Sequence, residues 1–199
     1  MTIQVYERKR SIESIIVEKM LLFRGTKKEY STIENPRYPK VPHYNHKHAY
    51  EKVLKLCKEI LSTVESPQQV ILMGDSSGGS IALSLAQLLK ENELPQPKEI
   101  VLFSACVDMT YSNPEIEQYD KVDNMLSTGG MSEITKLWAG ELNPNDPLIS
   151  PIHADLKGVA KISHFIGTHE ILYPDAIKFD EIMMKQGVKI TTYVFPKMS

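Results

Sequence analysis

One serine lies where its spacing and neighbours could make it a nucleophile. Ser76 is the third residue of the run GDSSGG, residues 74–79. The apolar run Val70–Met73 directly before it predicts a strand buried on both faces. Residues 80–89 directly after it are mostly apolar or small and predict a helix packed closely against the sheet. The G-x-S-x-G spacing then puts the Ser76 hydroxyl on a sharp strand-to-helix turn, which predicts a catalytic nucleophile.

The backbone N–H of Ser77 would begin that helix and point at a developing oxyanion. Ser77 is itself the weaker nucleophile candidate, because Asp75 and Gly79 lie two residues from it. A phosphate-binding turn is an alternative, but the run lacks the lysine of a P-loop and the spacing G-x-G-x-x-G. Plain turn chemistry is another alternative. The fragment is also similar to GDSGG of trypsin-type enzymes, which are all-β proteins without such a helix.

A carboxylate follows a second predicted strand. Residues 162–166 predict a strand that leads directly to Gly167-Thr168-His169-Glu170. Active residues of parallel sheets lie at the carboxyl ends of strands, and both Ser76 and Glu170 are placed there. Glu170 is therefore a candidate catalytic residue, with a solvated loop carboxylate as the alternative.

The alternation of elements from residue 69 onward predicts the fold class. Further strands are expected at 99–103 and 188–194, with a helix between Pro174 and Gly187. This order predicts an α/β fold with a mainly parallel sheet and helices on both faces. The long irregular segment 104–130 between predicted elements is expected to be functional.

The N-terminal part predicts no strand. Residues 11–23 carry a helical apolar stripe, and the Pro-rich residues 25–42 predict a loop. We therefore divide the chain into an N-terminal helix and linker, residues 1–37, and a domain, residues 38–199. An amphipathic helix over residues 44–64 begins that domain. Its three early histidines, His43, His46 and His48, match no common zinc pattern, so we predict neither a metal nor a cofactor.

Composition narrows the class of protein. The 199 residues carry a net charge of −2 with no basic stripe, which argues against nucleic acid as a partner. The two cysteines, Cys57 and Cys106, lie far apart in apolar segments and indicate buried thiols in a reduced compartment, the cytoplasm. Charges interrupt the N-terminal apolar run, so neither a signal peptide nor stable membrane insertion is expected.

The motifs together resemble the α/β-hydrolase fold, and more narrowly the hormone-sensitive-lipase-like carboxylesterases. The segment YPKVP, residues 38–42, is similar to the family's Y-P-x-x-P, and GDSSGG to its G-D-S-A-G-G elbow. Further pieces follow in family order: Asp108, residues 146–151, residues 167–170 and residues 195–198. The resemblance implies that Ser76 is the nucleophile, that the Ser77 N–H is one oxyanion donor and that Glu170 orients a histidine. It also implies small acyl esters as substrates.

Two departures from the family pattern suggest a truncated or internally deleted member. The family's catalytic histidine follows the phrase that here reads FPKM, residues 195–198, and the sequence ends at Ser199. The family's H-G-G-G-type oxyanion loop has no counterpart, and we expect the family's early strands to be missing. The strand before Ser76 would then be an exposed sheet edge, which predicts a homodimer or aggregation through that edge.

Three functional hypotheses follow from these observations. The first is a serine carboxylesterase that forms an acyl-enzyme on Ser76. The second is a catalytically dead remnant of a hydrolase, lacking the histidine and the H-G-G loop. The third is a module that binds an acyl ligand without chemistry.

Overall fold

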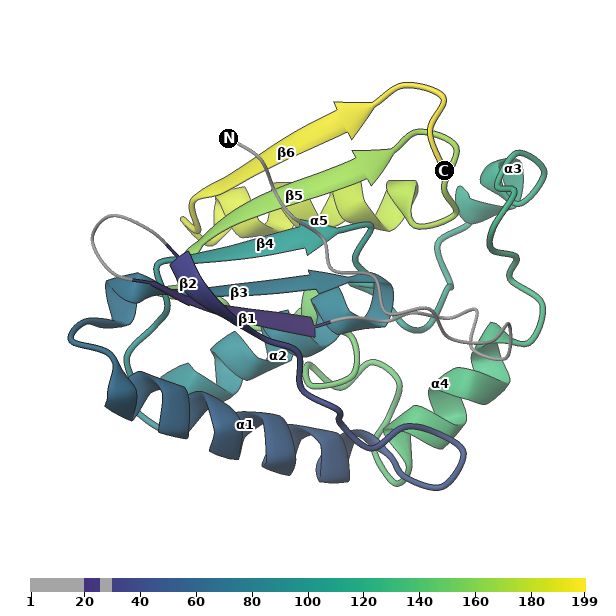
Figure 1. The fold of residues 1–199 in the computed structure, drawn as a ribbon. Coiled ribbons are helices and arrows are strands. Elements are labelled where there is room, and N and C mark those ends of the chain that lie inside the picture. Colours follow the sequence, from purple (N-terminus) through teal and green to yellow (C-terminus); the bar gives the residue numbers. More distant parts are fainter. Residues whose placement is uncertain (1–19, 26–29) are drawn as a thin grey trace.

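The computed structural model describes residues 20–25 and 30–199, which form one mixed sheet with helices packed against it (Figure 1). The strand order is β2-β1-β3-β4-β5-β6. The strands are β1 Met20–Gly25, β2 Tyr30–Glu34, β3 Val70–Asp75, β4 Glu99–Phe103, β5 Lys161–Gly167 and β6 Ile190–Phe195. The four strands β3 to β6 are parallel, whereas β1 is antiparallel to both β2 and β3. The predicted α/β class with a mainly parallel sheet is confirmed.

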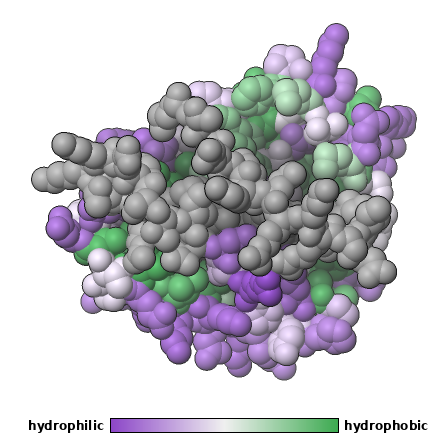
Figure 2. Space-filling view, in the orientation of Figure 1, coloured by the Kyte–Doolittle hydropathy of each residue, from purple (hydrophilic) through white to green (hydrophobic). Residues whose placement is uncertain are grey.

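Helices lie in every connection between successive strands from β2 onward. They are α1 His46–Thr63, α2 Ser76–Glu91, α3 Ile116–Tyr119, α4 Met131–Ala139 and α5 Tyr173–Lys185, with 3-10 turns at Pro67–Gln69 and Pro151–His153. The side of α1 that faces solvent is hydrophilic, as the lower part of Figure 2 shows. In the described part of the chain, no helix combines the length and the apolar character that crossing a membrane would take.

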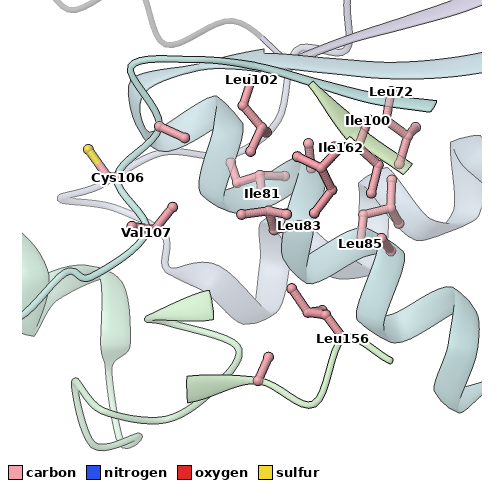
Figure 3. Packing of buried hydrophobic residues seen from close by; sticks show 14 of the residues in the cluster. Leu72, Ile81, Leu83, Leu85, Ile100, Leu102, Cys106, Val107, Leu156 and Ile162 are labelled. Carbon is pink, nitrogen blue, oxygen red and sulfur yellow. The ribbon is translucent and has the colours of Figure 1, made fainter. Parts of the chain in front are cut away.

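The three long helices α1, α2 and α5 lie on one face of the sheet. Leu72, Ile100 and Ile162 are register partners on β3, β4 and β5, and all three point toward α2 (Figure 3). His164 shares that face, and its ring lies 6.4 Å from the ring of Phe179 on α5. Helices on both faces were expected, but the long helices of the described residues cover only this one.

The opposite face carries a row of aromatic rings. Phe165 on β5 stacks on Phe103 of β4 at 5.0 Å and on Tyr193 of β6 at 4.6 Å between ring centroids. Phe103 is 41% exposed and Tyr193 46%. The apolar run of β3 predicted burial on both faces, yet Ile71 and Met73 on this side are only half-buried.

The N-terminal prediction was wrong where the structure can test it. Residues 20–25 form strand β1 instead of the end of a helix, and residues 30–34 form strand β2 instead of loop. The continuous apolar run Met20–Phe23 suits a strand, and pairing with β3 overrides the helical stripe. Residues 11–19, the rest of the predicted helix, lie outside the described residues.

This hairpin also corrects the expected position of β3 in the sheet. Two strands, β1 and β2, precede the elbow strand in the described sheet. Met20 pairs with Gly74 and Arg24 with Val70, so β1 covers β3 along its length. The strand β3 is therefore interior, not an exposed edge. Strands β1 and β2 precede residue 37 and the other strands follow it, and the division of the chain at that residue stays a prediction.

Candidate active site

The turn that carries Ser76 joins β3 directly to α2. Asp75 ends β3 in an extended conformation and Ser76 begins α2. The φ of Ser76 is +49°, in the left-handed region that side chains other than glycine rarely adopt. Such strain persists only where the surrounding structure enforces it, and it clusters at functional sites. A half-buried serine on a strained strand-to-helix turn is the geometry of a nucleophile elbow.

Glycine at position 74 is required by a close backbone approach. A Cβ on Gly74 would overlap the carbonyl group of Gly78, one turn into α2. A Cβ on Gly79 would come within 2.5 Å of the Ala105 Cβ, in the segment after β4. The glycines thus let β3, the first turn of α2 and the segment after β4 pack at contact distance.

Backbone groups of Cys106 hold the elbow from the neighbouring strand end. The Cys106 N–H donates to the Ser76 carbonyl oxygen at 3.0 Å. The hydroxyl of Ser80, in the first turns of α2, donates to the Cys106 carbonyl oxygen. Both residues are buried. We call these two hydrogen bonds of Cys106 the Cys106 clamp. No sequence pattern predicted them, because Cys106 lies 26 or more positions from Ser80 and Ser76.

The N–H of Ser77 lies in the first turn of α2, as expected. Amides of a first helical turn have no partner within the helix, and the helix dipole places partial positive charge there. An oxyanion formed at Ser76 would therefore meet a donor and a favourable field.

Glu170 lies three residues beyond the end of β5 and is 9% exposed. Its Oε1 accepts a hydrogen bond from the Gly167 N–H at 2.7 Å, and the Ser104 side chain also hydrogen-bonds to the carboxylate. The side chain is buried and held from two strands, unlike a solvated loop carboxylate.

Burial raises the pKa of Glu170 above its ordinary value. The hydrogen bonds from Ser104 and Gly167 oppose this rise in the pKa, because they favour the ionised carboxylate. The charge of Asp123 raises the pKa further, and His164 lowers it. The net result is a raised pKa, because burial outweighs the hydrogen bonds that favour the ionised carboxylate.

Ser76 and Glu170 emerge at the same edge of the sheet. Each follows a parallel strand, β3 or β5, and β4 lies between them (Figure 1). The strands are two spacings apart, about 10 Å. Ser104, at the end of the strand between them, spans part of this gap by contacting Glu170.

The segment after β6 lies against the loop that carries Glu170. The N–H of His169 donates to the Met198 carbonyl oxygen at 2.9 Å, and the N–H of Thr168 to the Phe195 carbonyl oxygen at 3.0 Å. The Lys197 N–H donates to the Thr168 hydroxyl at 2.9 Å. Residues 195–198 are thus fastened beside the candidate acid.

The histidines that opened the early helix have ordinary structural partners. The Nδ1 of His46 lies 2.9 Å from the Trp138 carbonyl oxygen, and His48 Nδ1 lies 2.9 Å from the Asn45 side-chain oxygen. His164 is buried on the helix-covered face. Within residues 20–25 and 30–199 no cluster of His, Cys, Asp or Glu could hold a metal.

The irregular segment 104–130 contacts the site through Asp123. One carboxylate oxygen of Asp123 accepts from the N–H of Ile171 at 2.9 Å, directly beside Glu170. The other accepts from the N–H groups of Met125 and Leu126 at 2.8 and 2.9 Å. The segment is thereby tied to the loop of the candidate acid, which no sequence pattern indicated.

The chain is similar to a known protein family over most of its length. Residues 19–199 match the family described as "alpha/beta hydrolase fold". An esterase from Acinetobacter venetianus is 28% identical over 154 residues, which are 77% of this chain and 51% of the esterase. An acetyl-hydrolase from Streptomyces hygroscopicus is 26% identical over 150 residues, 75% of this chain and 50% of that protein.

A solved structure agrees with these relatives. The crystal structure of a hormone-sensitive lipase from a metagenome library superposes with a TM-score of 0.77 at 28% identity. The match covers 81% of this chain and 55% of that structure. The chain thus spans about half the length of the curated relatives that it matches.

Proposed function

Because the chain belongs to the α/β-hydrolase fold family, among its hormone-sensitive-lipase-like carboxylesterases, we propose that it is a serine hydrolase that cleaves small acyl esters. The observation that carries the proposal is the conformation of Ser76. A serine at a left-handed φ, between a parallel strand and a helix, is what an acyl-transferring nucleophile elbow needs.

The chemistry would proceed in two steps. The Ser76 Oγ attacks the ester carbonyl, its proton passes to a base and then to the leaving alcohol, and an acyl-serine forms. Water then attacks the acyl-serine and releases the carboxylic acid and the free serine. The Ser77 N–H would stabilise the oxyanion of both steps.

Glu170 would orient the base. In the family that base is a histidine placed after the segment equivalent to residues 195–198. Hydrogen bonds of Phe195, Lys197 and Met198 to Thr168 and His169 support this role, since they bring that segment to the loop of Glu170.

Two alternatives stay open beside the esterase. A dead remnant would lack a base altogether, and loss of a triad base costs on the order of a million-fold in turnover. A binding module would retain an acyl ligand without forming product.

A location in the cytoplasm also stays a prediction. It is drawn from the free thiols of Cys57 and Cys106, both of which are buried.

Labelling with a fluorophosphonate probe separates these possibilities. We expect the probe to form a covalent adduct on Ser76, located by mass spectrometry of peptides, and Ser76→Ala to abolish it. Ser77→Ala is the matched control, because it removes the neighbouring hydroxyl and keeps the N–H that the oxyanion needs. Equal labelling of Ser76→Ala would overturn the assignment of the nucleophile.

Turnover of a p-nitrophenyl ester completes the test. Hydrolysis above that of Ser76→Ala supports the esterase. Absence of both labelling and hydrolysis overturns it in favour of the dead remnant, and binding of an acyl compound without product overturns it in favour of a binding module.

A further inference from the structure

Ser104 occupies a strained position between the strands of the two candidate catalytic residues. It directly follows β4, and its φ is +44°, again in the left-handed region. Its N–H donates to the Phe165 carbonyl oxygen of β5 at 2.8 Å, and its side chain hydrogen-bonds to Glu170. The bond to β5 fixes the backbone of Ser104, so the hydroxyl is directed across the strand ends to the carboxylate.

Asp123 holds the other side of the same loop. It contributes no donor to Glu170, but its carboxylate binds the N–H of Ile171, the next residue along the chain. The N–H groups of Met125 and Leu126 bind its second oxygen, so both oxygens of Asp123 have partners. The position of the Glu170 backbone therefore depends on a residue 47 positions earlier in the sequence.

We propose that Ser104 and Asp123 are the positioning residues of Glu170. Ser104 holds the carboxylate itself through its hydroxyl, and Asp123 holds the backbone beside it. The inference rests on the proposed role of Glu170 in the site, but it concerns a geometry that can be measured without catalysis.

The two residues act on the ionisation of Glu170 with opposite signs. A hydroxyl that donates to the carboxylate favours its charged form, whereas the negative charge of Asp123 disfavours it. The other groups that face Glu170 are the Gly167 N–H and His164, both from β5. A Ser104 hydroxyl that served only its own turn would leave the pKa of Glu170 unchanged, whereas a hydroxyl bonded to the carboxylate lowers that pKa.

The test follows the Glu170 carboxyl directly, in the full chain labelled with 13C at glutamate carboxyl carbons. Glu170→Gln identifies its resonance by loss, and a pH titration by NMR gives its apparent pKa. We expect Ser104→Ala to raise this pKa and Asp123→Asn to lower it, each by about 0.5 or more.

Three further variants control for indirect effects. Ser104→Gly removes the hydroxyl and relieves the left-handed strain, so it should raise the pKa of Glu170 as Ser104→Ala does. Ser112→Ala and Asp120→Asn change matched groups in the same irregular segment and should leave it unchanged. Asp120 binds the N–H of Thr128, whereas Asp123 binds that of Ile171.

Opposite changes in the pKa of Glu170 support the proposal. Unchanged titration in both variants, or changes of the same sign, would overturn it. Because the readout needs no turnover, its failure differs from failure of the proposed hydrolase function, which is measured by labelling of Ser76.

Discussion

At the scale of single residues, the candidate site is built from backbone conformations that cost energy. Ser76 and Ser104 both have left-handed φ angles directly after parallel strands. Each such residue costs on the order of 1–2 kcal/mol, which the packing around the elbow must offset. Two hydrogen bonds contribute to this stabilisation: the Cys106 N–H donates to the Ser76 carbonyl oxygen, and the Ser104 N–H donates to the Phe165 carbonyl oxygen of β5.

The sequence predicts some of these residues and not others. Ser76, Ser77 and Glu170 follow from short patterns attached to strands. Ser104 and Asp123 could not be predicted in this way, because they lie in a segment without a hydrophobic period. Their contacts to the Glu170 loop also span more than 45 positions of the sequence. Patterns report local structure, whereas these contacts depend on tertiary packing.

Asp175 is expected to make the stability of the folded protein depend on pH. It lies in the first turn of α5, is 2% exposed and accepts a hydrogen bond from Asn113 at 2.8 Å. Burial raises its pKa from 3.8 to about 6, and the charge of Asp108 adds to the rise. The folded state therefore binds more protons than the unfolded state between these values, so Asp175 lowers stability as pH rises from about 4 to about 6.

We expect Asp175→Asn to stabilise the protein more at pH 8 than at pH 4.5, with the two gains differing by about 1–3 kcal/mol. The amide oxygen can still accept from Asn113, and no buried charge remains. Urea unfolding of both proteins at the two pH values measures the difference. Glu117→Gln, at an exposed position, is the control. An equal gain at both pH values would contradict the argument.

At the scale of elements, strands and helices after residue 69 were predictable because each carries its own signal. The apolar run of β3, the small and apolar residues of α2, and Pro174 at the start of α5 identify elements within a few residues. The strand β1 carried a conflicting helical stripe, and its partner β3 lies about 50 residues away. Pairing at that distance is invisible to local periodicity.

The helix α2 holds the elbow through its buried side. Leu83 is fully buried and points into the core shown in Figure 3. We expect Leu83→Ala to lower the free energy of unfolding by about 2–5 kcal/mol, through lost burial and the cavity left behind. Leu137→Ala on α4, where the side chain is 49% exposed, should change it by less than about 1 kcal/mol. Urea denaturation of both variants measures this, and equal costs would contradict the packing described.

At the scale of the whole molecule, the hairpin β1–β2 decides which strands lie at the edges. The outermost strands of the described sheet are β2 and β6, so β3 is protected. A homodimer, predicted from the sequence through the edge of β3, remains a proposal, and it would have to use another surface.

Deleting residues 1–34 tests the protection of β3. The deletion removes β1 and β2 and exposes the backbone groups of β3 that now pair with β1, which creates an apolar edge. We expect this protein to associate or aggregate as concentration rises, measured by analytical ultracentrifugation. Deletion of residues 1–19 alone keeps the hairpin and should sediment as the full chain does. A monomeric product from the longer deletion would show that β1 does not shield the sheet.

The clamp made by Cys106 has a consequence for how the site arises in time. Because backbone groups of that residue fix both the carbonyl of Ser76 and the hydroxyl of Ser80, the turn lacks these restraints until β4 docks beside β3. During synthesis on a ribosome, residues 70–91 would emerge before β4 and Cys106 do. Ser76 would therefore reach its strained conformation only after β4 had docked beside β3. The reaction of Ser76 with an electrophile would then report, during translation, that β4 had docked.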